Sequence, residues 1–206
     1  MDPMAWYAPP GPQSVTDIIE DLGGTGSYQS CGTGCVMVTL GTAQNDYFRD
    51  TCTQIYPQQQ IFRVNRPDYI LSAQILEANW DDHLQITVND TPVYTSPSWY
   101  QSKPLGGSVC ELFKSWRLNT STPCIGGGSC TTPSNSVPFI DITSQMTSVA
   151  PGGLVRTNTA VIVGGGGEGF ARMRILYTPP GPPPALPTDP ADPKYRRCYA
   201  PDGSKK

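Results

Sequence analysis

The chain has 206 residues, the length of one or two domains. Its 21 glycines and 22 prolines make up about a fifth of the sequence, and both residues oppose helix interiors by roughly 1–3 kcal/mol each. Only 15% of residues are charged and the net charge is −3, which argues against nucleic acid or an anionic membrane as a partner. Four tryptophans and ten tyrosines supply apolar surface to bury, so a loop-rich all-β module is expected.

The seven cysteines predict disulfides in an oxidising compartment. No pair has C-x-x-C spacing and His83 is the single histidine, so no metal site is expected. Glycines lie between Cys31 and Cys35, and between Cys124 and Cys130, and would let these two short loops close. The pairing is left open among six candidates: Cys31, Cys35, Cys52, Cys110, Cys124 and Cys130. Cys198 is the expected unpaired cysteine, because it follows a proline-rich stretch.

The N-terminal part, residues 1–27, is expected to be an extended flank. Within it, Ser14 to Asp17 has the pattern of a capping box, and a short helix is expected to end at Gly23. No window approaches ~20 consecutive apolar residues, so no membrane-spanning helix is predicted. The start of the chain also lacks the basic and apolar regions of a signal peptide, so we expect a segment of a larger exported protein.

The central part, residues 28–178, is expected to be a β-sandwich, because short strands alternate with turn signals. The clearest strand is 83–88, in which apolar and polar residues alternate. Asn89-Asp90 predicts a tight turn, followed by an edge strand at Pro92–Tyr94. The other predicted strands are 36–40, 60–64, 69–80, 138–142, 157–163 and 170–177, and segment 45–56 is unassigned.

Two segments of the chain have no strand pattern. Residues 96–137 form a long irregular insertion with three cysteines and several aromatic residues, and such insertions are usually functional or flexible. Residues 179–206 begin with a run of prolines that predicts a stiff, extended linker and tail. The expected architecture is therefore a disulfide-stapled, jelly-roll-like sandwich between proline-rich flanks.

Two motifs have a catalytic and a simpler interpretation. Gly164–Gly169 matches the G-x-G-x-x-G pattern, but Phe170–Tyr177 alternates like a strand, so a tight turn between two antiparallel strands is favoured over nucleotide binding. Asp81-Asp82-His83 is the densest ionisable cluster, yet it has no second histidine and opens a strand. Glu168 could form a carboxylate pair of the kind that cleaves sugars, but the sequence does not show that any second carboxylate faces it. Neither enzyme activity nor a cofactor is expected.

Aromatic residues in the insertion are the candidate contact residues. Trp99 and Tyr100 lie in a polar, proline-flanked stretch, and Trp116 follows further along. Exposed Trp and Tyr carry much of the binding energy at protein interfaces. The alternative interpretation is that these rings cap an open edge of the sandwich or cover the Cys124–Cys130 loop.

Several blocks of the sequence, taken in order, resemble TraN-type mating-pair stabilisation proteins of conjugative, type IV secretion plasmid systems. Ala78–Asp90 contains W-D-D followed by V-N, and Ser108–Glu111 contains C-E. Phe139–Ile142 and Asn158–Arg174, with its G-G-x-G-E-G-F run, are similar to later blocks of the family. The pattern also looks like that of galactose-binding-like jelly rolls. It covers about 61–177, and departs from the family at Asp90, where glycine is usual.

The resemblance implies a cell-surface recognition module on the extracellular face of the outer membrane. Its partner would be an outer-membrane protein of a recipient cell, bound through surface complementarity, with the remainder of the parent protein or other conjugation proteins nearby. Two alternatives stay open: a carbohydrate-binding module that uses the same aromatic residues, and a structural appendage or virion subunit.

Overall fold

The computed structural model describes residues 12, 14–24, 26–46, 53–81, 83–97, 115–124, 129–163 and 167–181. At residues 41–46, 53–58, 81, 83, 115, 160–163 and 167–169 this description covers the backbone only. The chain divides into two units, residues 14–179 and the combined ends 1–13 and 180–206. Nearly all of the second unit lies outside the described residues, so the fold described below is that of the first.

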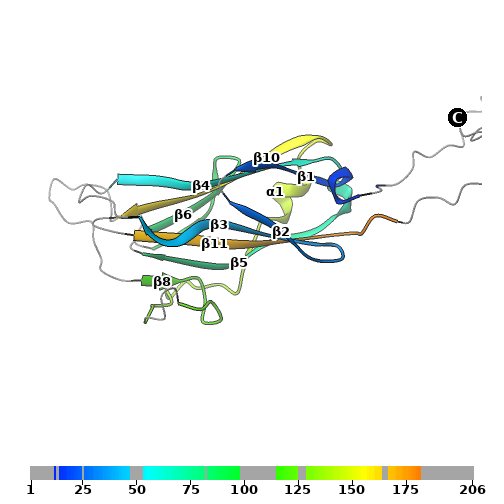
Figure 1. The fold of residues 1–206 in the computed structure, drawn as a ribbon. Coiled ribbons are helices and arrows are strands. Elements are labelled where there is room, and N and C mark those ends of the chain that lie inside the picture. The colour runs from blue at the N-terminus through cyan, green and yellow to red at the C-terminus, as the bar shows by residue number, and fades with distance from the viewer. Residues whose placement is uncertain are drawn as a thin grey trace, which may run out of the picture. The chain divides into compact units, whose positions relative to one another are not determined.

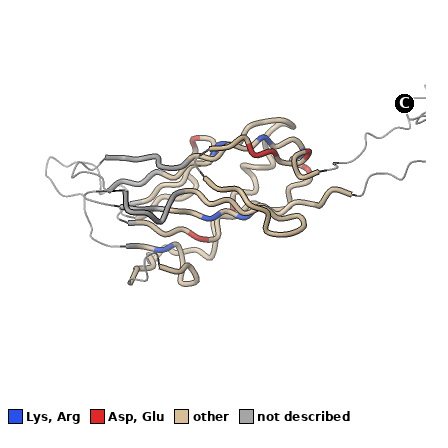
Figure 2. The backbone as a smooth tube through the Cα atoms, viewed as in Figure 1, with Lys and Arg blue, Asp and Glu red and all other residues tan. Residues whose placement is uncertain are grey.

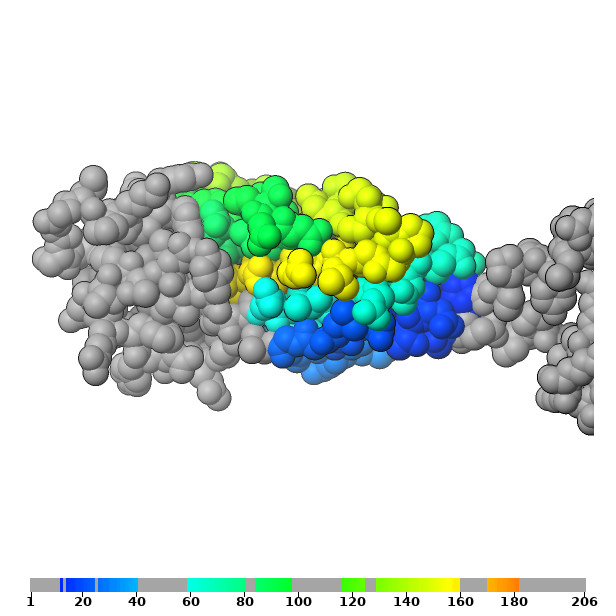
Figure 3. All heavy atoms as spheres, turned by 90° about the horizontal axis from the view of Figure 1, so that it is seen from above, coloured from blue at the N-terminus to red at the C-terminus, as the bar shows by residue number. Residues whose placement is uncertain are grey.

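Two antiparallel sheets pack face to face as a β-sandwich (Figure 1). The sheet that we call the β10 sheet contains, in order, β1 (Ile19–Gly24), β4 (Thr53–Val64), β10 (Gly153–Val163), β6 (His83–Val88) and β7 (Thr91–Thr95). The β11 sheet contains β2 (Ser27–Gly32), β3 (Cys35–Asp46), β11 (Gly167–Tyr177), β5 (Ile70–Asp81) and β8 (Ser115–Arg117), and the short β9 (Ile140–Asp141) also pairs with β5. Figure 3 looks onto the β10 sheet from outside, with blue β1, cyan β4, yellow β10 and green β6 and β7 side by side.

The strand order is that of a jelly roll. Strands β3 to β6 alternate between the two sheets, and β7 returns beside β6. β8 then joins the β11 sheet, and β10 and β11 each insert between strands formed much earlier in the chain. The result is β4-β10-β6-β7 facing β3-β11-β5-β8, with β1 and β2 each adding one strand. The predicted sandwich and its jelly-roll-like pattern are confirmed.

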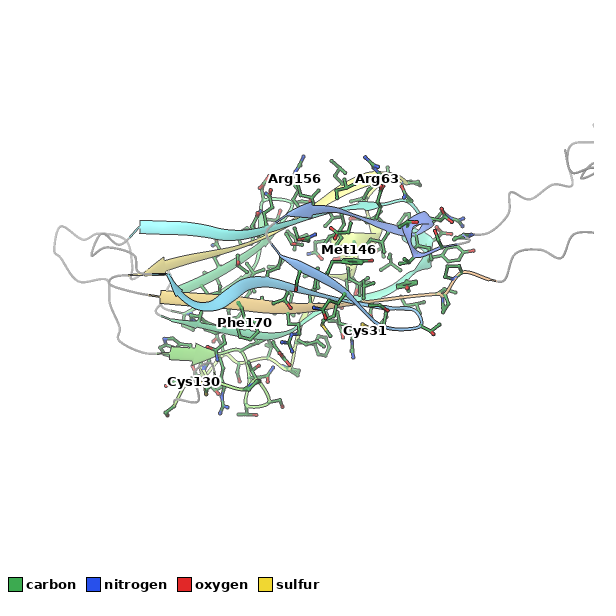
Figure 4. All side chains as sticks on the ribbon, in the orientation of Figure 1. Cys31, Arg63, Cys130, Met146, Arg156 and Phe170 are labelled. Atoms are coloured by element: carbon green, nitrogen blue, oxygen red, sulfur yellow. A yellow bond between two sulfur atoms is a disulfide. The ribbon has the colours of Figure 1, made fainter. Side chains whose placement is uncertain are left out.

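The core lies between the sheets and follows the two-residue period of the strands. In β11, four alternate residues are buried while Arg172 and Arg174 lie on the outer face, as their alternation predicts. Met146, from the five-residue helix α1 (Thr143–Thr147), is fully buried between the sheets, whereas Arg63 and Arg156 point away from them (Figure 4). The buried residues of β11 are Ala171, Met173, Ile175 and Tyr177.

A bulge in β5 changes which residues face the core. Ala73 and Ile75 are buried, and so are Ala78 and Trp80, although the two pairs have opposite parity. The pairing with β11 shifts by one residue between Ile75 and Glu77, which leaves Leu76 as the extra residue. This shift explains why residues 69–80 show no continuous alternation.

The N-terminal flank contributes to the sandwich earlier than expected. The capping box is present, because the Asp17 amide donates to Ser14 Oγ (3.3 Å) and the Ser14 amide donates to the Asp17 carboxylate (3.0 Å). However, it starts only one 3-10 turn, η1 (Val15–Asp17), instead of a helix that reaches Gly23. Ile18 and Ile19 are fully buried and β1 pairs with β4, so tertiary pairing outweighs the local helix signal.

The Asn89-Asp90 turn is a two-residue hairpin loop between β6 and β7. Both residues have positive φ angles, 49° and 63°, and Val88 pairs directly with Thr91. This geometry is that of a type I′ turn, in which aspartate takes the place of the more usual glycine. The predicted tight turn and the edge position of β7 are confirmed.

Two disulfides close the two short cysteine loops. The Cα atoms are 5.1 Å apart in Cys31–Cys35 and 5.8 Å apart in Cys124–Cys130. These bonds indicate an oxidising environment, extracellular or periplasmic. Cys52, Cys110 and Cys198 lie outside the described residues.

Candidate functional site

The candidate contact residues belong to the connection between β7 and β8. Trp99 and Tyr100 lie outside the described residues, while Trp116 lies in β8. The described residues on either side, up to Pro97 and from Ser115 onward, define where this connection joins the sandwich. The site is therefore built from its two attachment points.

The attachment point after β7 is fixed by Ser96. Its amide donates to the carbonyl of Leu84 (2.8 Å), and its hydroxyl accepts a hydrogen bond from the Leu84 amide (3.1 Å). Ser96 is 1% exposed, so both bonds are shielded from water. The side chain thus continues the β6–β7 pairing one step beyond the end of β7.

The attachment point at β8 is aromatic. Trp116 pairs directly with Trp80 of β5, and Trp80 packs edge-on against Tyr94 of β7, with ring centroids 5.7 Å apart. Trp80 is fully buried, as expected for the end of the core, and Trp116 is partly buried against the same core. Both ends of the connection therefore meet one aromatic cluster, and Trp116 lies in the edge strand of the β11 sheet.

The titratable side chain of the described aromatic cluster is Tyr94. Burial raises the pKa of Tyr94 to about 12. The Tyr94 hydroxyl and the Trp80 indole nitrogen are buried without a hydrogen-bond partner. This part of the site can pack and position a neighbouring segment, and the Tyr94 hydroxyl stays un-ionised at pH 7.

The disulfide loop that follows β8 is held against the outer face of the β11 sheet by Asn79. This side chain is 1% exposed, and its Nδ2 donates to the carbonyl of Pro123 (3.1 Å). The same nitrogen lies 4.0 Å from Cys130 Sγ. Figure 4 shows Cys130 beside β8, on the side of the β11 sheet that faces away from the core. A buried amide therefore ties the loop to β5 near its C-terminal end.

Arg117 fixes the other side of the same loop. Its Nε donates to Thr132 Oγ1 (2.7 Å) and its Nη1 donates to the carbonyl of Thr122 (3.3 Å). Its backbone amide donates to the carbonyl of Thr131 (2.9 Å), beside a parallel bridge between Trp116 and Thr131. The guanidinium is thus used to fix the loop.

Asn119 organises the start of this segment. Its side-chain oxygen accepts from the amides of Ser121 (2.9 Å) and Thr122 (3.0 Å), an Asx turn, and its Nδ2 donates to the carbonyl of Pro138 (3.0 Å). The Asn119-Thr-Ser triplet, which has the pattern of a glycosylation site, therefore uses its amide inside the fold. We call residues 115–138, from β8 through this turn and the disulfide loop, the clipped segment.

The ionisable cluster and the glycine run show no arrangement for catalysis in the described part of the chain. Asp81 and His83 are described by backbone alone, at the ends of β5 and β6, and Asp82 lies outside the described residues. No three His, Cys, Asp or Glu side chains come together as metal ligands among the described residues. Residues 167–169 begin β11, so the helix of a nucleotide-binding fingerprint does not follow.

The glycine run differs in one respect from its expected role. β10 and β11 belong to opposite sheets and do not pair with each other. The run from Gly164 to Gly169 therefore lies where the chain crosses between sheets, and it is not a hairpin turn between paired strands. The side chain of Glu168 is outside the described residues.

Comparisons of the chain with protein-family models, curated proteins and solved structures find no match. Within the described residues, no helix is long and apolar enough to cross a bilayer. Three residues that sequence reasoning missed define the site: Asn79, Arg117 and Asn119. Only Asn119 carries a local signal, because asparagine side chains commonly accept a hydrogen bond from the backbone amide two residues further on.

Proposed function

We propose that this chain is a cell-surface recognition module that binds an outer-membrane protein of a recipient bacterium and stabilises mating pairs during conjugation. The observation that carries the proposal is the pair of fixed attachment points, Ser96 and Trp116, on one aromatic cluster. A rigid scaffold that holds both ends of a connection between strands is the usual arrangement of a binding loop. The ordered resemblance to TraN-type proteins supplies the identity of the partner.

The clipped segment supports the same proposal. It contributes no strand longer than three residues, yet its position is set by Asn79, Arg117, Asn119 and a disulfide. Fixing an irregular surface before binding lowers the entropy that association would otherwise lose. Recognition would proceed by surface complementarity, without covalent chemistry, on the extracellular face of the outer membrane.

The test uses the purified full chain and outer-membrane vesicles from recipient cells. Replacing Trp99 and Tyr100 together with alanine should weaken vesicle binding by about thirtyfold or more, since even one aromatic anchor at an interface is worth ≥ ~2 kcal/mol. Leu71→Ala is the matched control, because Leu71 is 62% exposed at the opposite end of β5 from Trp80. Mating frequency with the same variants in the parent protein provides the second readout.

Three results would overturn this proposal. Absence of wild-type binding to vesicles from every recipient tested would remove the recognition function. If the double variant binds vesicles as well as the wild type does, Trp99 and Tyr100 are not part of the binding surface. Competition of vesicle binding by a free glycan would favour the carbohydrate-binding alternative, which the jelly-roll topology also fits because lectin domains use it.

A further inference from the structure

Each sheet has two edges, and three of the four are protected against pairing with another chain in the described structure. The outer side of β8 is occupied by the backbone of Thr131. β7 is five residues long, contains Pro92 and has a bulge in its pairing with β6. β1 carries Glu20 and Asp21 and has a register shift before Gly24. Short strands, proline, charge and bulges are the usual means of blocking an edge.

The fourth edge, β2, has little of this protection. Its six residues, Ser27 to Gly32, include no charged residue and no proline, and Figure 2 shows the strand without blue or red. Ser27, Gln29 and Ser30 are exposed, and the single register shift falls beyond Ser30. The blue N-terminal strands form one rim of the view in Figure 3. Residues 27–30 therefore present a regular strand edge to solvent.

The hairpin that contains this edge is held at three points. The Tyr28 ring lies 6.2 Å from the Phe62 ring, and the Cys31–Cys35 disulfide joins β2 to β3. At the turn, the Tyr177 amide donates to the carbonyl of Gly34 (2.9 Å). Gly34 has a φ of +72°, and a Cβ there would lie 2.6 Å from the Tyr177 carbonyl oxygen, so only glycine fits. A strand fixed in this way loses little conformational entropy when another strand pairs with it.

We propose that β2 is a docking edge that accepts an extended strand of a partner polypeptide. This strand carries one lysine or arginine, which faces Asp21, and is otherwise uncharged. Backbone hydrogen bonds would supply most of the affinity, as in other cases of strand addition to a sheet edge. The site is separate from the β7–β8 connection, and it adds a second contact to the proposed recognition function.

The charge of the partner follows from Asp21. This exposed carboxylate lies on β1 and accepts hydrogen bonds from Gln60 and from the Gly23 amide (2.8 Å). In the β1–β4 register Asp21 lies opposite Phe62, whose ring is 6.2 Å from the Tyr28 ring of β2. Burial is the main cause that raises the pKa of Tyr28 to about 12, and the charges of Tyr177 and Asp21 add to it. An incoming strand beside β2 therefore meets one negative charge.

The same charge argues against a second copy of this chain as the partner. If β2 paired with β2 of another copy, the two β1 strands would also approach each other, and the Asp21 carboxylate of one copy would meet that of the other, whereas Glu20 is already paired with Arg63 (2.7 Å). Like charges placed opposite each other destabilise such a pair. A partner strand with one basic residue would instead be attracted by the Asp21 carboxylate.

The probe is a pair of synthetic capped peptides, Thr-Val-Thr-Lys-Thr-Val-Thr and the same sequence with Glu in place of Lys. Hydrogen exchange of the full chain is followed with increasing peptide. The lysine peptide should slow exchange at residues 27–30, and the glutamate peptide should bind about threefold more weakly, the scale of an exposed ion pair. Asp21→Asn keeps the oxygen that accepts from Gln60 and should remove the difference between the two peptides.

Proline substitutions provide the matched controls. In an edge strand, alternate residues turn their N–H toward the neighbouring strand or toward solvent. Of Gln29→Pro and Ser30→Pro, one should therefore keep the fold and lose peptide binding, while the other disrupts the β2–β3 hairpin. Circular dichroism and exchange at β3 distinguish the two.

Failure of this inference is distinguishable from failure of the proposed function. Unchanged exchange at residues 27–30 at the highest soluble peptide concentration overturns the docking edge, and equal binding of the two peptides overturns the role of Asp21. A dimer in sedimentation that the folded proline variant abolishes would make a second copy the partner and overturn the proposal. Vesicle binding through Trp99 and Tyr100 is measured separately and can succeed or fail independently.

Discussion

The two disulfide loops are nearly equal in length but differ in what else holds them. Cys31–Cys35 spans four residues of sequence and closes a hairpin whose strands are already paired. Cys124–Cys130 spans six and lies in a segment that is held mainly by the side chains of Asn79 and Arg117. In a chain-entropy model, either cross-link stabilises the folded state by about 2 kcal/mol.

The comparison shows that equal loop entropy does not imply equal roles. Without its disulfide, the β2–β3 hairpin keeps its backbone pairing in the folded state. The entropy that the unfolded chain regains therefore appears entirely as a loss of global stability. Without its disulfide, the loop that follows β8 has few backbone bonds and can open while the sandwich stays folded. One disulfide therefore affects global stability, and the other affects local order on the surface.

The largest effect is expected from Asn79→Ala. The change leaves the Pro123 carbonyl without its partner and removes a buried side chain, at a cost of about 2–3 kcal/mol in unfolding free energy. Urea denaturation measures this loss. Gln29→Ala, an exposed position on β2, is the control and should change stability by less than about 0.5 kcal/mol. A loss below about 1 kcal/mol for Asn79→Ala would mean that the loop is not tied to β5 through this amide.

Replacing Cys31 and Cys35 together with serine should come next. We expect about 2 kcal/mol lower unfolding free energy with unchanged hydrogen exchange in β3, because the paired strands remain ordered. Urea denaturation and native-state exchange of the same sample provide both values. Rapid exchange throughout the hairpin would show that the disulfide, and not the pairing, holds its register.

Replacing Cys124 and Cys130 together with serine should have the smallest global effect, about 1 kcal/mol, because the freed segment regains entropy in the folded state. The local effect should be large, with hydrogen exchange at residues 119–137 about tenfold faster. If stability falls as much as in the Cys31 and Cys35 variant and exchange is unchanged, the side-chain bonds alone suffice and the contrast fails.

Part of this structure follows from sequence, and particular residues show why the rest does not. Alternation correctly predicts β6 and the inner face of β11, and glycine-containing spacing singles out both described disulfide loops. β1 was missed because Ile18 and Ile19 follow a genuine capping box, and their pairing with β4 is a contact between distant residues. The two faces of β5 could not be assigned from the sequence, because the bulge at Leu76 is set by the pairing of β5 with a distant strand, β11.

The site was harder to predict than the fold. Trp116 was identified from its residue type, and the structure places it in an edge strand beside Trp80. Asn79 lay within a predicted strand with no sign of a special role, since its partner at Pro123 is 44 residues away. Trp99 and Tyr100 remain predictions, because they lie outside the described residues.

The central positions of β10 and β11 constrain the order in which this chain can mature. Each of these late strands pairs on both sides with strands made earlier, β11 with β3 and β5, and β10 with β4 and β6. The β10 sheet stays split until β10 has been made, and the β11 sheet stays split until β11 ends at Tyr177, so the core cannot close before the last strand is present. Such late pairing of distant strands makes folding slow. The two disulfides join near neighbours, so oxidation of these cysteines does not have to wait for that last step.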